Sequence, residues 1–95
     1  MIFKVLGTEA SLPTTTGTAT SFSEARRVRL ANTSTDNREI TIVSTQSGDV
    51  VGKFTLLPTG SNTGGNAVII EKEYTECVFA SGAAVKGVKV GFVGY

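Results

Sequence analysis

Short runs of alternating apolar and polar residues, separated by clusters of Thr, Ser, Gly and Asn, most constrain how this chain folds. In residues 26–31, Val28 and Leu30 lie on one face of an extended chain, and the residues between them lie on the other. The same period of two recurs at Ile40 and Ile42. Ser21 and Glu24 match a capping box, which allows at most one helical turn. The pattern therefore predicts an all-β domain.

The expected strands recur every 8–12 residues or so, a spacing typical of an antiparallel β-sandwich or small barrel of about seven strands. Gly52 interrupts one of them and indicates a bulge or a close backbone approach, and Pro58 ends that strand because it has no N–H to donate. The predicted strands are residues 2–6, 26–31, 38–44, 50–57, 67–74, 75–81 and 85–95.

The chain has 95 residues and forms one domain, 1–95. A domain of this size buries a small core, and the single cysteine, Cys77, allows no internal disulfide. Such domains often gain stability by packing against copies of themselves or a larger partner, so we expect a homo-oligomer.

Residues 8–20 are rich in Thr, Ser and Gly and contain Pro13, which predicts a long loop. A long loop in a small domain is usually functional or disordered. Two interpretations stay open for residues 1–25: an arm that orders on a neighbouring subunit, or an exposed flexible loop. In the first interpretation the candidate contact residues are Thr14, Thr15 and Thr16.

Arg26, Arg27 and Arg29 form the only basic cluster, and Arg27 and Arg29 project from the same face. They fit a solvated face, a protein–protein contact or, more weakly, a phosphate backbone, because no aromatic residues are interleaved with them. The formal net charge is +1, which supplies no long-range field toward nucleic acid or an anionic membrane. We therefore expect neither as a partner.

The residues give little support to catalysis or metal binding. The chain has no His to activate Cys77, so we interpret this thiol as a buried structural residue. Glu71, Glu73 and Glu76 lack the spacing of a calcium loop, and we expect Glu71 and Glu73 on a solvated strand edge with Lys72 pointing away. We expect no enzyme, no metal and no cofactor.

The apolar run at the start of the chain is shorter than a signal peptide requires, and no run approaches the length of a membrane span. A single cysteine fits a reducing compartment. We therefore expect the protein to be made and kept in a cytoplasm.

The order of the β runs resembles small virion structural proteins of tailed bacteriophages, especially short β-rich ones from phages of marine bacteria and cyanobacteria. In that family a Glu-Lys-Glu/Asp stretch usually precedes Pro-Thr-Asp, whereas here Tyr74-Thr75-Glu76 follows. The runs that carry the resemblance are 28–33, 40–43, 51–56, 68–73 and 84–90.

The resemblance implies a non-enzymatic virion protein, assembled in the host bacterial cytoplasm. Its first implication is a head decoration (cement) protein that binds the major capsid protein on the outer capsid surface, often as a trimer. A neck, tail or fibre protein is the nearest alternative, and a small carbohydrate- or protein-binding sandwich is another. We expect residues 2–6 and 85–95 to be open sheet edges and the first 25 residues to contact the capsid or a neighbouring copy.

Overall fold

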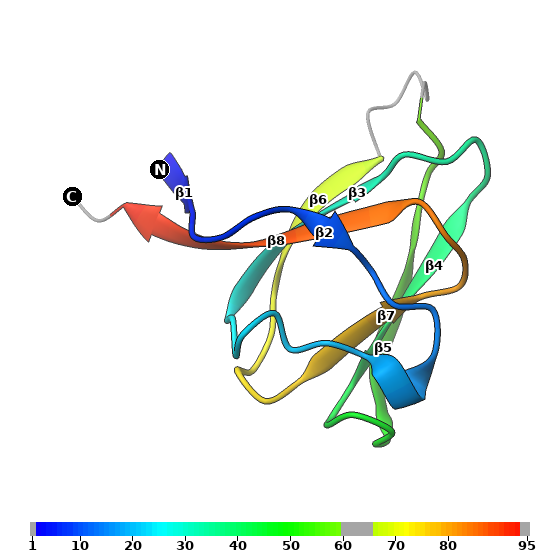
Figure 1. The fold of residues 1–95 in the computed structure, drawn as a ribbon, viewed down its shortest axis with the longest axis horizontal. Helices are drawn as coiled ribbons and strands as arrows, with labels where there is room; N and C mark the ends of the chain where they lie inside the picture. Colours follow the sequence, from blue (N-terminus) through cyan, green and yellow to red (C-terminus); the bar gives the residue numbers. More distant parts are fainter. Residues whose placement is uncertain (1, 60–65, 94–95) are drawn as a thin grey trace.

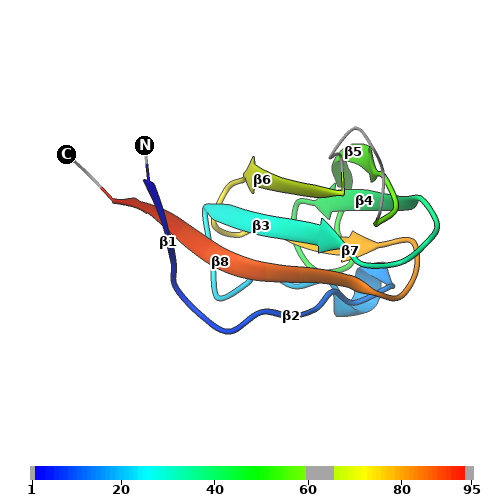
Figure 2. The same ribbon diagram turned by 90° about the horizontal axis from the view of Figure 1, so that it is seen from above.

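Two antiparallel β-sheets pack face to face in the computed structural model, which describes residues 2–59 and 66–93 (Figures 1 and 2). The smaller sheet has the order β5-β4-β7. In the larger sheet the order is β1-β8-β3-β6, with β2 also paired to β8. The described part contains no α-helix, and of the predicted antiparallel β-sandwich or small barrel the structure has the sandwich. The strands are β1 (Ile2–Val5), β2 (Ala10–Ser11), β3 (Arg27–Asn32), β4 (Arg38–Val43), β5 (Val50–Leu56), β6 (Ala67–Glu71), β7 (Cys77–Ala80) and β8 (Val85–Val93).

Strand β8 lies inside the larger sheet over residues 85–89, which corrects the prediction of an open edge there, whereas residues 90–93 are paired only with β1 in the described part of the chain. Its first half pairs with β3 on one side and with β2 on the other. Its second half pairs with β1, from Val5↔Val90 to Ile2↔Val93. This second half and β1 form a two-stranded ribbon that projects from the sandwich (Figures 1 and 2).

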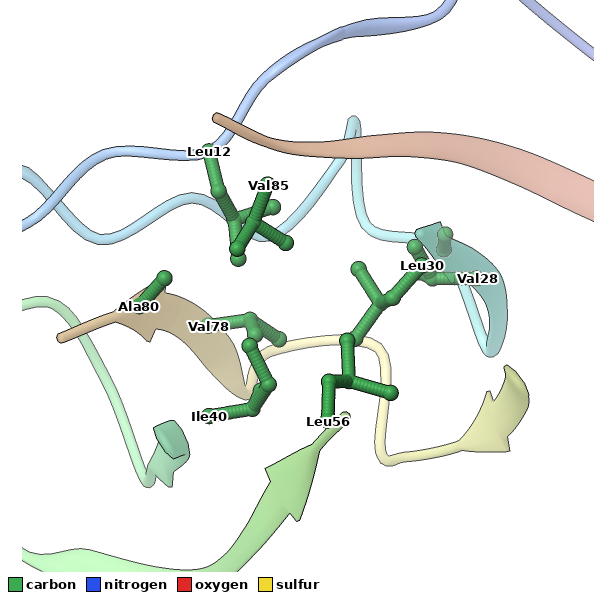
Figure 3. Packing of buried hydrophobic residues seen from close by; sticks show 9 residues of the cluster. Leu12, Val28, Leu30, Ile40, Leu56, Val78, Ala80 and Val85 are labelled. Carbon is green, nitrogen blue, oxygen red and sulfur yellow. The ribbon is translucent and has the colours of Figure 1, made fainter. Parts of the chain in front are cut away.

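The core lies between the sheets, where the predicted inward residues meet. Val28 and Leu30 of the larger sheet and Ile40 of the smaller sheet are fully buried. Figure 3 shows Leu12 and Val85 side by side, reaching toward the side chains of the smaller sheet. Leu12 is 5% exposed although it belongs to no strand.

Residues 12–20 cross from one sheet to the other, and we call this segment the strap. The Leu12 N–H donates to the Val85 carbonyl at 2.7 Å in the larger sheet, and the Ala80 N–H donates to the Pro13 carbonyl at 3.0 Å in the smaller sheet. Thr20 and Val78 then exchange two backbone hydrogen bonds, at 3.1 and 2.9 Å. The sequence predicts a long loop over residues 8–20. They instead contain β2 and a 3₁₀ turn (η1, Thr16–Thr18).

A left-handed turn links the strap to β3. Phe22, Ser23 and Glu24 have φ angles of 54°, 56° and 59°, a region that L-residues rarely adopt in succession. The Ser21 hydroxyl accepts a hydrogen bond from the Glu24 N–H at 3.1 Å, which is the contact a capping box predicts. The allowed single turn is therefore present, with the opposite hand to an α-helix.

A small second cluster covers the outer face of the smaller sheet. Ala19 of the strap packs there with Val43 and Cys77, and Phe79 lies against them. Cys77 is a free cysteine, 7% exposed, so its interpretation as a buried residue is confirmed. The strap therefore covers the smaller sheet as well as joining it to the larger one.

Asn32 is a fully buried polar residue that ties the end of β3 to the end of β5. Its Nδ2 donates to the carbonyls of Asp36, Leu56 and Leu57 at 2.8, 3.3 and 3.1 Å. Its Oδ1 accepts from the N–H and hydroxyl of Ser34, which builds the turn between β3 and β4. The described part also contains the bulge expected near Gly52, where the β4–β5 register shifts.

Candidate functional site

The two sets of predicted contact residues lie at different places on the molecule. Thr14, Thr15 and Thr16 are exposed on the strap, and Thr16 is the first residue of η1, which packs on β7. Arg26 precedes β3, and Arg27 and Arg29 lie within it. Both views place η1 and the start of β3 far apart (Figures 1 and 2). These residues therefore do not form one site.

Arg27 and Arg29 lie on the outer face of the larger sheet, each beside a carboxylate. Arg27 lies 3.5 Å from Glu71 of β6, and Arg29 lies 3.6 Å from Glu9, which precedes β2. The Arg29–Glu9 pair bridges β8 in the sheet, where Val88 is 4% exposed. These ion pairs are solvent-accessible, so each contributes little to stability.

A polar hollow of about 350 Å³ opens where β3 begins and β6 ends. Six charged residues line it: Arg26, Arg27, Glu71, Lys72, Glu73 and Glu76. Three of these are basic and three acidic, so the lining has no net charge at neutral pH. The Arg26 guanidinium lies 5.4 Å from the centre of the Tyr74 ring, within the range of a cation–π contact.

Lys72 is the buried charge of this hollow, 6% exposed at the end of β6. Its Nζ donates to the carbonyls of Glu76 at 2.7 Å and Glu73 at 3.2 Å, inside the turn that leads to β7. Burial lowers the pKa of Lys72, and Lys89 lowers it further, while Cys77 and Glu76 oppose the shift. Glu71 and Glu73 are exposed on either side of it, as the alternation predicts.

The projecting ribbon carries exposed apolar side chains. Val5 is 61% exposed and Leu6 is 46% exposed, and the Leu6 N–H donates to the Lys89 carbonyl at 2.8 Å. A second hollow, of about 210 Å³, lies between the base of the ribbon and the left-handed turn. Lys89 reaches across it, and its Nζ donates to the Ser23 carbonyl at 3.3 Å.

Strands β5 and β6 end their sheets on the side of the sandwich opposite the strap (Figure 2). On β5, Val50 and Val51 are 56% and 57% exposed, and on β6, Val68 is 36% exposed. Strand β6 was predicted from its alternation. The sequence predicts a solvated strand edge at Glu71 but no strand order, because a local pattern of residues does not encode which strands are neighbours.

No group of three or more His, Cys, Asp or Glu residues is placed to hold a metal ion within residues 2–59 and 66–93. In the same part of the chain, no helix has the length and apolar character needed to cross a membrane. Residues 60–65, between the predicted strands 50–57 and 67–74, lie outside the described residues.

Comparison with known proteins finds no matching family model, no matching curated protein and no matching solved structure. The surfaces of the molecule are therefore the basis for a functional interpretation.

Proposed function

We propose that this protein is a non-enzymatic structural component of a tailed-bacteriophage particle, a decoration protein that binds the outer capsid surface. The observation that carries the proposal is the ribbon of β1 and the second half of β8, which projects from the sandwich and exposes Val5, with Leu6 also exposed at its base. A two-stranded ribbon is only marginally stable alone in water. Contact with a partner would cover it.

The ribbon suits strand addition, in which one protein extends the sheet of another through main-chain hydrogen bonds. The order of the larger sheet ends at β1, so its outer edge is open in the described part of the chain. Val5 lies beside this edge and would supply apolar contact. The sandwich behind it, joined by the strap, would serve as the rigid body that bridges capsid subunits.

The test is the copy number of this chain in purified particles of the phage that encodes it, measured by quantitative mass spectrometry against the major capsid protein. A decoration protein is present in numbers comparable to the capsid protein. A few copies per particle would assign it to the neck, tail or fibre instead. Its absence from the particle would overturn the virion proposal.

A ribbon variant tests the contact itself. Val5→Asp places a charge on the ribbon and should reduce incorporation into particles at least tenfold. Val50→Asp is the matched control, because Val50 is exposed to a similar extent on β5, away from the ribbon. Equal incorporation of both variants would show that the ribbon is not the capsid contact.

A further inference from the structure

In the part of the chain that the structure describes, strand β6 is an open sheet edge, and its sequence lacks the usual protection against pairing. Its sequence is Ala-Val-Ile-Ile-Glu, with no Pro and no Lys, and its register with β3 is unbroken. Strand β5 contrasts with it, because a bulge interrupts its start and Lys53 lies 3.8 Å from Glu39 across the sheet. Bulges and edge lysines discourage strand addition, so β6 is the edge that can pair more readily with another strand.

The hydrogen bonds that flank β6 show which of its backbone groups point away from the sheet. The backbone N–H of Asn32 donates to the Asn66 carbonyl at 2.7 Å, and the Lys72 N–H donates to the Arg26 carbonyl at 2.8 Å. Residues 66 and 72 thus bond toward β3, and alternation assigns 68 and 70 to the same direction. The N–H and C=O groups of Ala67, Ile69 and Glu71 therefore face outward.

We propose that β6 of one copy pairs with β6 of a second copy, antiparallel and about a two-fold axis at Ile69. In this register the outward groups of Ile69 bond to Ile69 of the second copy, and those of Ala67 bond to Glu71. All five residues of each strand are paired, and any shift along the strand leaves some of them unpaired. The two larger sheets then form one continuous sheet across a self-complementary interface.

The side chains of β6 suit this register on both faces. Val68 lies opposite Ile70 of the second copy on one face, and Ile69 meets its own copy on the other. Glu71 lies opposite Ala67, so no like charges face each other across the axis. The Arg27–Glu71 ion pair, at 3.5 Å within one copy, remains at the ends of the interface.

The pairing does not depend on a place in a phage particle, and it uses the opposite end of the larger sheet from the ribbon. The first test is the mass of the purified protein across a range of concentrations, by sedimentation and native mass spectrometry. We expect a concentration-dependent dimer. A monomer at all concentrations, or a trimer, would overturn the proposal.

Ile69→Glu tests the edge directly, because it places two carboxylates opposite each other at the two-fold axis. Within each copy the new carboxylate is paired across the strands with Arg29, an opposite charge. We expect at least a tenfold weaker dimer, with an unchanged circular dichroism spectrum. Val51→Glu is the matched control on the β5 edge and should dimerise like the wild type. Equal effects of the two variants, or none, would contradict pairing through β6.

A cysteine at the axis tests the register. Residues that exchange both hydrogen bonds have Cα atoms about 5.5 Å apart, which a disulfide spans. Ile69→Cys in a Cys77→Ser background should therefore form a covalent dimer under mild oxidation, read out by intact mass. Val51→Cys in the same background should remain monomeric under denaturing conditions. A dimer that resists this cross-link would show that the strands do not pair at Ile69.

Discussion

The two sides of the sandwich differ in what lies beyond the last strand. On one side the strap runs from β8 to β7 and joins the sheets by backbone hydrogen bonds. On the other side β5 and β6 end their sheets, and no further described strand covers them (Figure 2). We call the side covered by the strap the closed side, and the side where β5 and β6 end the open side. The polar, Thr-rich strap thus belongs to the closed side, while a regular apolar strand lies at the edge of the open side. The surface that can still pair with another chain is therefore formed by regular strands, and the surface that is already covered is formed by irregular chain.

The largest effect should come from loosening the closed side at Leu12. This side chain is 5% exposed and packs with Val85 in the core (Figure 3). Leu12→Ala leaves a cavity and removes apolar burial, so the free energy of unfolding should fall by about 3 kcal/mol. Urea denaturation followed by circular dichroism measures this change.

The matched control for Leu12 lies on the open side. Val51 is 57% exposed, so Val51→Ala should change the free energy of unfolding by no more than about 0.5 kcal/mol. If the two variants lose the same stability, the strap is not part of the cooperative structure and the contrast between the sides fails.

Asn32 is the next strongest link, because one buried side chain joins β3 to the end of β5. Asn32→Ala removes its bonds to the Leu56 and Leu57 carbonyls and leaves them without that donor. We expect the free energy of unfolding to fall by about 2 kcal/mol. Thermal and urea unfolding both report it. Asn37→Ala, at an exposed position in the same turn, should be nearly neutral, and equal losses would show that the buried hydrogen bonds contribute nothing.

Much of the fold was predictable because strand faces follow a period of two. Val28, Leu30 and Ile40 are buried as predicted, since the pleat alone assigns their faces. The closed side was not predictable. Only Leu12 and Ala19 carry an apolar signal within the polar strap, too few to define a period.

The candidate contacts were harder to predict than the fold. Arg27 and Arg29 were expected on one face, and the structure adds their carboxylate neighbours Glu71 and Glu9, which come from distant segments. The position of β8 between β3 and β1 also depends on long-range pairing. Local alternation carries no information about which strand lies beside which, so the open edges required the structure.

The left-handed turn leaving the strap offers a smaller effect of opposite sign. Ser23 has φ 56° and an exposed side chain, and glycine adopts this conformation without the steric penalty of a Cβ. Ser23→Gly should therefore raise the free energy of unfolding by about 1 kcal/mol. Thr35→Gly, at an exposed bend without positive φ, should lower it slightly. A loss of stability in Ser23→Gly would mean that the Ser23 side chain itself stabilises the turn.

The smallest effect concerns Lys72, where β6 ends on the open side. Its pKa in the folded protein lies below the ordinary value of 10.5, chiefly because the charge is buried. Between these two pKa values the unfolded chain holds a proton that the folded chain has released, so the free energy of unfolding rises with pH. Lys72→Met lacks this titration.

The stability difference, wild type minus Lys72→Met, should therefore be constant near neutrality, increase as the pH approaches 10.5 and then level off. Urea denaturation between about pH 7 and 11 measures it, and Lys86→Met, which removes one exposed lysine, is the control for the loss of a positive charge. A Lys72 difference that falls with rising pH would mean that the carbonyls of Glu73 and Glu76 stabilise the ammonium more than burial destabilises it. The ammonium group of Lys72, at the end of β6 on the open side, would then stabilise the fold rather than destabilise it.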